Sequence, residues 1–225
     1  MMSVYMTEEE QLAVIKRWWT RYSTTITVVL SLILLAISGV KYWHWHEEKL
    51  KTQASVSFEQ MMQAVSNQDN KSIRAYANQI IQDYPKTVYS DAAYLTLSKM
   101  YVAKANYKKA EVVLQSVANN GNIPVFKQIA KIRLARLLAN EKSFQQALAV
   151  LSVVDDEAYM PVVEELKGDV YAAKGQYQKA VESYRAAMSS VRHRGMGNLY
   201  LEMKTNEIAA KASTQMSLQS KTESV

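Results

Sequence analysis

Three stretches of the chain repeat one spacing of small, aromatic and aliphatic residues, and this repetition limits the possible folds more than any other feature. The first copy runs from Ser98 to Val117 and the second from Ala135 to Val154. Ala110, Ala147 and Ala180 hold the same place in the three copies, at intervals of 37 and 33 residues. The third copy is the clearest and consists of Gly168, Tyr171, Gly175, Tyr177, Ala180, Tyr184 and Ala187.

The period and the residue types predict a stack of helical hairpins. Each repeat would form two antiparallel helices, which the small residues allow to approach closely, while the large residues fill the space between one pair and the next. A period of about 34 residues with this pattern is the tetratricopeptide signature. Solenoids of this kind display a concave surface and rarely carry chemistry of their own.

Composition favours helices and excludes several kinds of site. The chain has only six Gly and three Pro in 225 residues, which is unlike a turn-rich β fold. It has no Cys, so disulfides, thiol catalysis and thiolate metal sites are excluded. The net charge of +6 lies beyond Leu50, but its Lys and Arg are scattered and form no run. We therefore expect no nucleic-acid partner.

A stretch of nineteen residues without a charge, from Tyr22 to Val40, precedes the repeats. As a helix it would rise roughly 30 Å, the thickness of a bilayer core. Trp18, Trp19 and Tyr22 flank one end and Tyr42, Trp43 and Trp45 flank the other, as the aromatic belts of a spanning helix do. The sequence thus predicts an all-α protein with a single N-terminal transmembrane helix followed by a tetratricopeptide-like helical-repeat solenoid.

Two alternatives concern this segment. Ala36-Ile37-Ser38 before Gly39 resembles a signal-peptide cleavage site, but the long preceding region with three consecutive Glu favours an uncleaved anchor. The orientation is open, because three basic residues lie close to either end of the span. Charge alone only mildly favours an N-terminus inside and a C-terminal domain outside.

The predicted organisation is an N-terminal arm at 1–21, a transmembrane helix at 22–40, a juxtamembrane helix at 41–56, a repeat domain at 57–212 and a polar, flexible tail at 213–225. Within the repeat domain we expect a degenerate first helical pair at 58–65 and 72–83, repeats at 91–119, 128–154 and 161–191, and a last helix at 198–212.

Catalysis is not expected, and neither is a cofactor or a metal. His44 and His46 are two residues apart and point in different directions on a helix, while His193 lies between two Arg. The carboxylates at 155–157 fall in a predicted loop, where a solvated turn explains them. The sequence contains no nucleophile-elbow, phosphate-loop or zinc-protease motif.

The first helix of each repeat supplies the residues that we expect on the concave side. They form a partly apolar groove, with Lys99 and Arg136 making one end basic and two carboxylates making the other acidic. The predicted partner-binding groove consists of Leu95, Lys99, Val102, Ile132, Arg136, Glu165 and Asp169.

Several segments of the sequence resemble one family. They are the opening Thr7-Glu-Glu-Glu-Gln-Leu-Ala-Val-Ile-Lys-Arg-Trp-Trp19, Tyr42-Trp43 after the span, Leu134-Ala-Arg136, Gly168 with Lys174-Gly175, and Leu201-Glu-Met-Lys204. Together they resemble the YfgM family, the ancillary subunits of the bacterial Sec translocon, over nearly the whole chain. The tail after Ala212 extends past the usual end of that family.

The resemblance implies an inner-membrane protein with a cytoplasmic N-terminus and a periplasmic repeat domain. It also implies association with the Sec translocon and with a membrane-anchored periplasmic chaperone of prolyl-isomerase type. In this interpretation the chain assists newly exported, unfolded proteins. The alternative is a scaffold for another envelope assembly process that binds no client.

Overall fold

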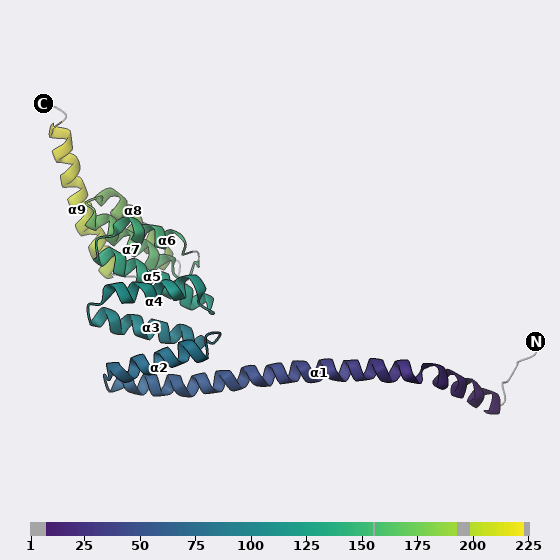
Figure 1. The fold of residues 1–225 in the computed structure, drawn as a ribbon. Coiled ribbons are helices and arrows are strands. Elements are labelled where there is room, and N and C mark those ends of the chain that lie inside the picture. The colour runs from purple at the N-terminus through teal and green to yellow at the C-terminus, as the bar shows by residue number, and fades with distance from the viewer. Residues whose placement is uncertain (1–7, 155, 193–198, 223–225) are drawn as a thin grey trace, which may run out of the picture. The chain divides into compact units, whose positions relative to one another are not determined.

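The computed structural model describes residues 8–154, 156–192 and 199–222. Within these residues the chain forms nine helices and no strand, which confirms the predicted all-α class. The helices are α1 (Glu8–Ser66), α2 (Asn70–Asp83), α3 (Val88–Ala103), α4 (Tyr107–Asn120), α5 (Pro124–Asn140), α6 (Phe144–Ser152), α7 (Met160–Ala173), α8 (Tyr177–Arg192) and α9 (Leu199–Thr222), as Figure 1 shows.

The contacts divide the chain into two units, Met1–Gln53 and Ala54–Val225. The second unit therefore begins at Ala54, three residues before the predicted start of the repeat domain at 57. Residues 1–7 of the predicted N-terminal arm lie outside the described part of the chain. Helix α1 starts at Glu8 and its last residues, from Ala54 on, belong to the repeat domain.

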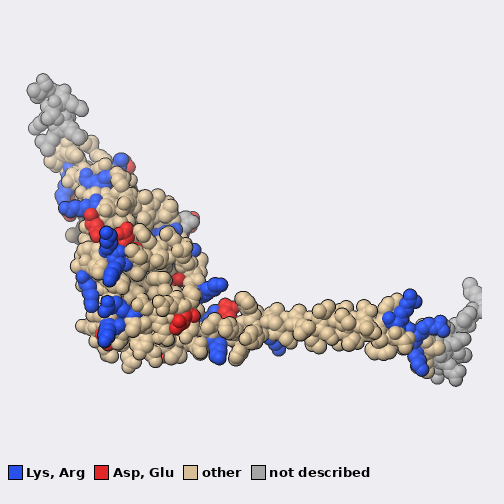
Figure 2. All heavy atoms as spheres, in the orientation of Figure 1, with Lys and Arg blue, Asp and Glu red and all other residues tan. Residues whose placement is uncertain are grey.

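The first unit consists of the long N-terminal part of α1. Its apolar side chains, such as Leu30 and Leu35, are exposed, and Figure 2 shows no charged side chain along the middle of this stretch. At its two ends, the rings of Trp18 and Tyr22 lie 5.6 Å apart and those of Tyr42 and Trp45 6.1 Å apart. Among the described residues, α1 is the one helix long and apolar enough to cross a membrane, judged by length and composition.

One turn geometry closes all four helical pairs of the repeat domain. In each pair, the residue two positions before the second helix has a positive φ: Gln68 (56°), Ala105 (54°), Lys142 (62°) and Gly175 (72°). The next N–H then donates back to a carbonyl five residues earlier, as from Gln176 to Tyr171 at 2.9 Å. This left-handed ending is free of steric cost only for Gly. The pair formed by the end of α1 and α2 thus folds like the others, although its sequence lacks most of the repeat residues.

Small residues bring the two helices of a pair together, as the sequence predicted. Ala110, Ala147 and Ala180 are fully buried. A Cβ atom on Gly168 would lie 2.4 Å from Cε1 of Tyr184, so only Gly fits where α7 and α8 cross. The spacing of small and large residues in the sequence therefore reflects contacts between helices.

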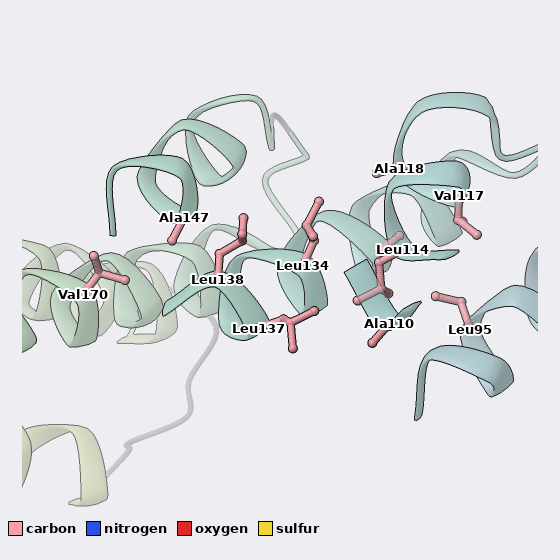
Figure 3. Close-up of a cluster of buried hydrophobic side chains, with 11 residues drawn as sticks. Leu95, Ala110, Leu114, Val117, Ala118, Leu134, Leu137, Leu138, Ala147 and Val170 are labelled. Atoms are coloured by element: carbon pink, nitrogen blue, oxygen red, sulfur yellow. The ribbon is translucent and has the colours of Figure 1, made fainter. Parts of the chain in front are cut away.

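The apolar core of the stacked pairs consists of separate clusters of buried residues. Its largest cluster reaches from Leu95 on α3 to Val170 on α7, and Figure 3 shows its side chains converging between the helices. Met61 of α1 packs in a second cluster with Ile80 of α2 and Met100 of α3. Because both of these clusters include residues from neighbouring pairs, the pairs that they join do not bury their apolar surface alone.

One buried carboxylate ties the start of α3 to the loop before α5. Asp91 is only 2% exposed, and it accepts hydrogen bonds from the backbone N–H groups of Asn122 (2.6 Å) and Ile123 (2.9 Å). The side-chain amide of Asn122 also donates to Asp91, at 3.0 Å. The carboxylate thus pairs two backbone N–H groups in a loop between repeats, where no helical hydrogen bond is available to them.

The predicted end of the last helix is wrong. Helix α9 continues to Thr222, through most of the segment expected to be a polar tail, while Asn198 and residues 223–225 lie outside the described residues. No Gly or Pro follows Gly197 to stop a helix. The hydroxyls of Ser213 and Thr214 donate to the carbonyl of Ala210, so these polar residues are accommodated in the helix.

Enlarging a buried alanine should destabilise the repeat domain. We expect Ala147→Leu and Ala180→Leu each to lower the free energy of unfolding by about 1–3 kcal/mol, because the helices cannot separate to admit the larger side chain. Thermal unfolding followed by circular dichroism measures the change. Ala149→Leu, on an exposed position of α6, is the matched control and should leave the midpoint nearly unchanged. Unchanged midpoints for both buried substitutions would contradict the repeat register.

Candidate partner-binding groove

The first helices of successive repeats lie next to each other, as the predicted groove requires. Helix α3 contacts α5, and α5 contacts α7, although other helices intervene in the sequence. All seven predicted groove residues lie on these three helices. The structure nevertheless separates the seven residues into three sets.

The first set consists of Leu95 and Ile132, and the prediction that they contact a partner is wrong. Leu95 and Ile132 are 7% and 5% exposed, so neither side chain is available to a partner. Leu95 packs in the largest core cluster with Leu114 of α4. Ile132 packs with Leu151 of α6. Both side chains therefore belong to the core between neighbouring helices and not to an accessible groove surface.

The second set lines one cavity. Lys99 and Val102 of α3 and Arg136 of α5 are exposed and surround a cavity of about 490 Å³ between α3, α4 and α5. We call this space the basic cavity. Its remaining lining residues are Ser98, Tyr107, Leu114, Arg133, Leu137 and Asn140.

Arg133 is the main residue of this cavity that the sequence analysis missed. Its guanidinium donates to the backbone carbonyl of Leu95 at 3.4 Å, a bond that links α5 to α3. Arg133 and Arg136 are three residues apart on α5, so they lie on the same side of the helix. That spacing, together with Lys99 one repeat earlier, was the signal in the sequence that could have identified it. Figure 2 shows Lys and Arg side chains gathered on the visible face over α3 to α5.

The third set, Glu165 and Asp169, is already occupied within the chain. Lys204 of α9 forms ion pairs with Glu165 at 3.0 Å and with Asp169 at 2.5 Å. The hydroxyl of Tyr184 donates to Asp169 at 2.7 Å. The negative charge at the predicted acidic end of the groove is therefore partly compensated by the last helix, which the sequence could not place against α7.

The contacts around Lys204 shift two pKa values. Burial disfavours the charged ammonium, but the hydrogen bonds to Asp169 and Glu165 more than compensate and raise the pKa of Lys204. Burial also raises the pKa of Tyr184, and its hydrogen bond to Asp169 adds to that effect. The Lys204 ammonium lies 5.2 Å from the ring centroid of Tyr184, close enough for a cation–π contact.

A second cavity, of about 820 Å³, lies between α6, α7 and α8. Its lining includes Lys167 and Lys179, but also Glu164 and Glu182, so both signs of charge are present. Lys167 donates to Glu164 at 2.7 Å. This cavity has no net charge to select a partner by sign.

A metal site has no support among the residues that the structure describes. No group of three or more His, Cys, Asp or Glu side chains lies close enough to hold an ion there. His44 and His46 lie on exposed positions of α1, and the ring of His46 stacks on Tyr42 at 6.3 Å. His193 and Asp155 lie outside the described residues.

Comparison with known protein families agrees with the repeat architecture. Residues 16–210 match the family of tetratricopeptide repeat-like domains. The chain belongs to this family. A likeness to a solved structure, MamA from residue 41 to its end from Desulfovibrio magneticus, has a TM-score of 0.49 and 16% identity, and it covers 75% of this chain and 96% of that one.

Three curated relatives carry the same name, ancillary SecYEG translocon subunit. The relative from Haemophilus influenzae is 28% identical over 128 residues, which are 57% of this chain and 62% of the relative. Those from Aggregatibacter actinomycetemcomitans and Escherichia coli are also 28% identical, over 57% and 51% of this chain. Each match spans less than two thirds of the relative's length. The name confirms the resemblance to the YfgM family.

Removing the ammonium of Lys204 should destabilise the end of the repeat domain and change its response to alkali. We expect Lys204→Met to cost roughly 1–3 kcal/mol at neutral pH, because two partly buried carboxylates lose their charged donor. Both raised pKa values mean that the folded state holds these protons more tightly than the unfolded state. The contribution of these two groups to the free energy of unfolding is complete at pH values below their ordinary pKa values, which are 10.0 for Tyr and 10.5 for Lys. It is lost as the pH rises above those values.

Denaturation of the full chain in detergent between neutral pH and pH 11 measures this effect. The alkaline loss of stability should be shallower in Lys204→Met than in the parent. Lys211→Met is the matched control on the same helix, because Lys211 forms only an exposed pair with Glu207, of a kind that contributes little. Equal alkaline slopes for the parent and Lys204→Met would contradict the interpretation.

Proposed function

We propose that this chain is a non-catalytic, membrane-tethered interaction module that associates with the Sec translocon. The observation that carries the proposal is the match to three relatives named ancillary SecYEG translocon subunit. The family assignment supports it, because tetratricopeptide-like solenoids present surfaces to other proteins. The exposed apolar length of α1 supports a membrane anchor.

The finer role follows from the resemblance to the YfgM family. The chain would be a single-pass protein of the bacterial inner membrane, with its N-terminus in the cytoplasm and its repeat domain in the periplasm. There it would work with a membrane-anchored chaperone of prolyl-isomerase type and assist newly exported proteins while they are unfolded. The exposed residues of the predicted groove, Lys99, Val102 and Arg136, are our proposed contacts for a partner.

A topology experiment tests the membrane part of this proposal. An alkaline phosphatase fused after Val225 should be active, and a green fluorescent protein exported by the Sec route at the same position should be dark, because both would lie in the periplasm. The chain should stay in the membrane fraction after carbonate extraction, since its span is an uncleaved anchor. A fragment beginning at Gly39, or the opposite reporter result, would contradict the proposed topology.

Co-purification tests the functional part. The full chain, tagged at its C-terminus and produced at its natural level, should enrich SecY, SecE and SecG from membranes dissolved in mild detergent. An unrelated single-span protein with the same tag is the control for carry-over. If the translocon subunits are no more abundant with the chain than with this control, the proposed association is wrong. Enrichment of another envelope complex in their place would favour the scaffold alternative.

A further inference from the structure

The basic cavity has three cationic side chains and no carboxylate in its lining. Lys99 comes from α3, and Arg133 and Arg136 come from α5. None of the three forms an ion pair with a carboxylate of the described residues; Arg133 has only its bond to a backbone carbonyl. Like charges held together in this way repel one another unless an anion neutralises them.

Some other cationic side chains of the repeat domain are neutralised within it. Lys204 pairs with two carboxylates of α7, and Lys167 and Lys211 each pair with a carboxylate on their own helix. The larger cavity between α6, α7 and α8 contains both signs of charge. The basic cavity differs from these regions because its lining brings three cations together without a carboxylate.

The walls of the basic cavity are not purely cationic. Val102 is 43% exposed at its edge, and the nearly buried Leu114 and Leu137 form part of its lining. Tyr107 and Asn140 add neutral hydrogen-bonding groups. A ligand that matches this lining carries carboxylates at its ends and an apolar side chain between them. A guanidinium binds a carboxylate through two parallel hydrogen bonds, which gives Arg136 and Arg133 a geometric preference for such groups.

We propose that the basic cavity binds an acidic segment of a partner polypeptide, in which Asp or Glu residues flank an aliphatic one. The carboxylates contact Lys99 and Arg136, and the aliphatic side chain lies on Val102. A polypeptide fits better than a nucleic acid, because the apolar lining is aliphatic and a single partly buried Tyr supplies the aromatic surface of the cavity. The inference rests on the proposed role of the repeat domain as an interaction module, but not on its association with the translocon.

Fluorescence anisotropy with the purified full chain in detergent tests the inference. The probe is a short labelled peptide in which Glu, Leu and Ser alternate, and the comparison probe has Gln in place of every Glu. We expect the Glu probe to bind and to weaken as salt is added, and the Gln probe to bind at least about tenfold more weakly. Equal binding of the two probes would overturn the proposal.

Charge reversal at the cavity supplies the second measurement. Lys99→Glu combined with Arg136→Glu should weaken binding of the Glu probe at least about tenfold, because two attractive contacts become repulsive. The matched control, Lys86→Glu with Arg185→Glu, changes the net charge equally at exposed positions outside the cavity and should bind as the parent does. A similar loss in the control would show a general charge effect and overturn the proposal.

Three checks complete the experiment. Circular dichroism should show the same thermal midpoint for all variants, and the milder Lys99→Gln with Arg136→Gln replaces the reversal if that variant does not fold. Arg136→Lys keeps the positive charge but loses the two parallel hydrogen bonds, so it should bind more weakly than the parent and more tightly than the charge-reversed variant. A single-stranded oligonucleotide should not displace the Glu probe at equal concentration; displacement would overturn the proposal in favour of nucleic acid.

The same variants separate this inference from the proposed function. Loss of probe binding with SecY still co-purifying supports the acidic-segment site and leaves the translocon association intact. Absence of SecY from the parent's co-purification, with probe binding lost only in the cavity variant, contradicts the association alone and supports the site.

Discussion

The repeat domain depends on the close approach of its paired helices. Gly168 makes this plainest, because a single methyl group there would lie 2.4 Å from the ring of Tyr184. Ala110, Ala147 and Ala180, which hold one position of the repeat on the second helix of three pairs, are fully buried. When the second helices pack this closely against the first, the first helices of successive repeats come next to each other. The surface formed by α3 and α5, with the basic cavity in it, is a consequence of that arrangement.

The distribution of charge over this surface follows from one long-range contact. Lys204 of α9 forms ion pairs with Glu165 and Asp169 of α7. Its hydrogen bonds to these carboxylates outweigh the unfavourable desolvation of its ammonium. The carboxylates that would have made the groove bipolar are used to attach the last helix. The cations of the basic cavity have no comparable partner among the described residues, so the part of the groove between α3 and α5 is basic. An interaction module of this kind selects partners by charge, which influences both specificity and association rate.

Much of the fold was predictable, because the repeat pattern is local and redundant. The positions of the repeats, the role of the small residues and the all-α class follow from a spacing that occurs three times. The turns were less predictable. Ala105 and Lys142 adopt the left-handed conformation that Gly175 adopts without strain, and residue type alone does not indicate it. The end of α9 was missed for a similar reason, since polar Ser and Thr residues are compatible with both a helix and a tail.

By itself, the sequence determined the helical repeat, the apolar span and the pairing of small with large residues. These features depend on neighbours within one or two turns of helix or on a fixed period. Tertiary structure decided which groove residues remain accessible. A first helix of a repeat packs on its sides as well as its back, so Leu95 and Ile132 became core residues, although their spacing resembles that of Lys99 and Arg136. The partner of Glu165 lies 39 residues away on another helix, and no local pattern encodes that contact.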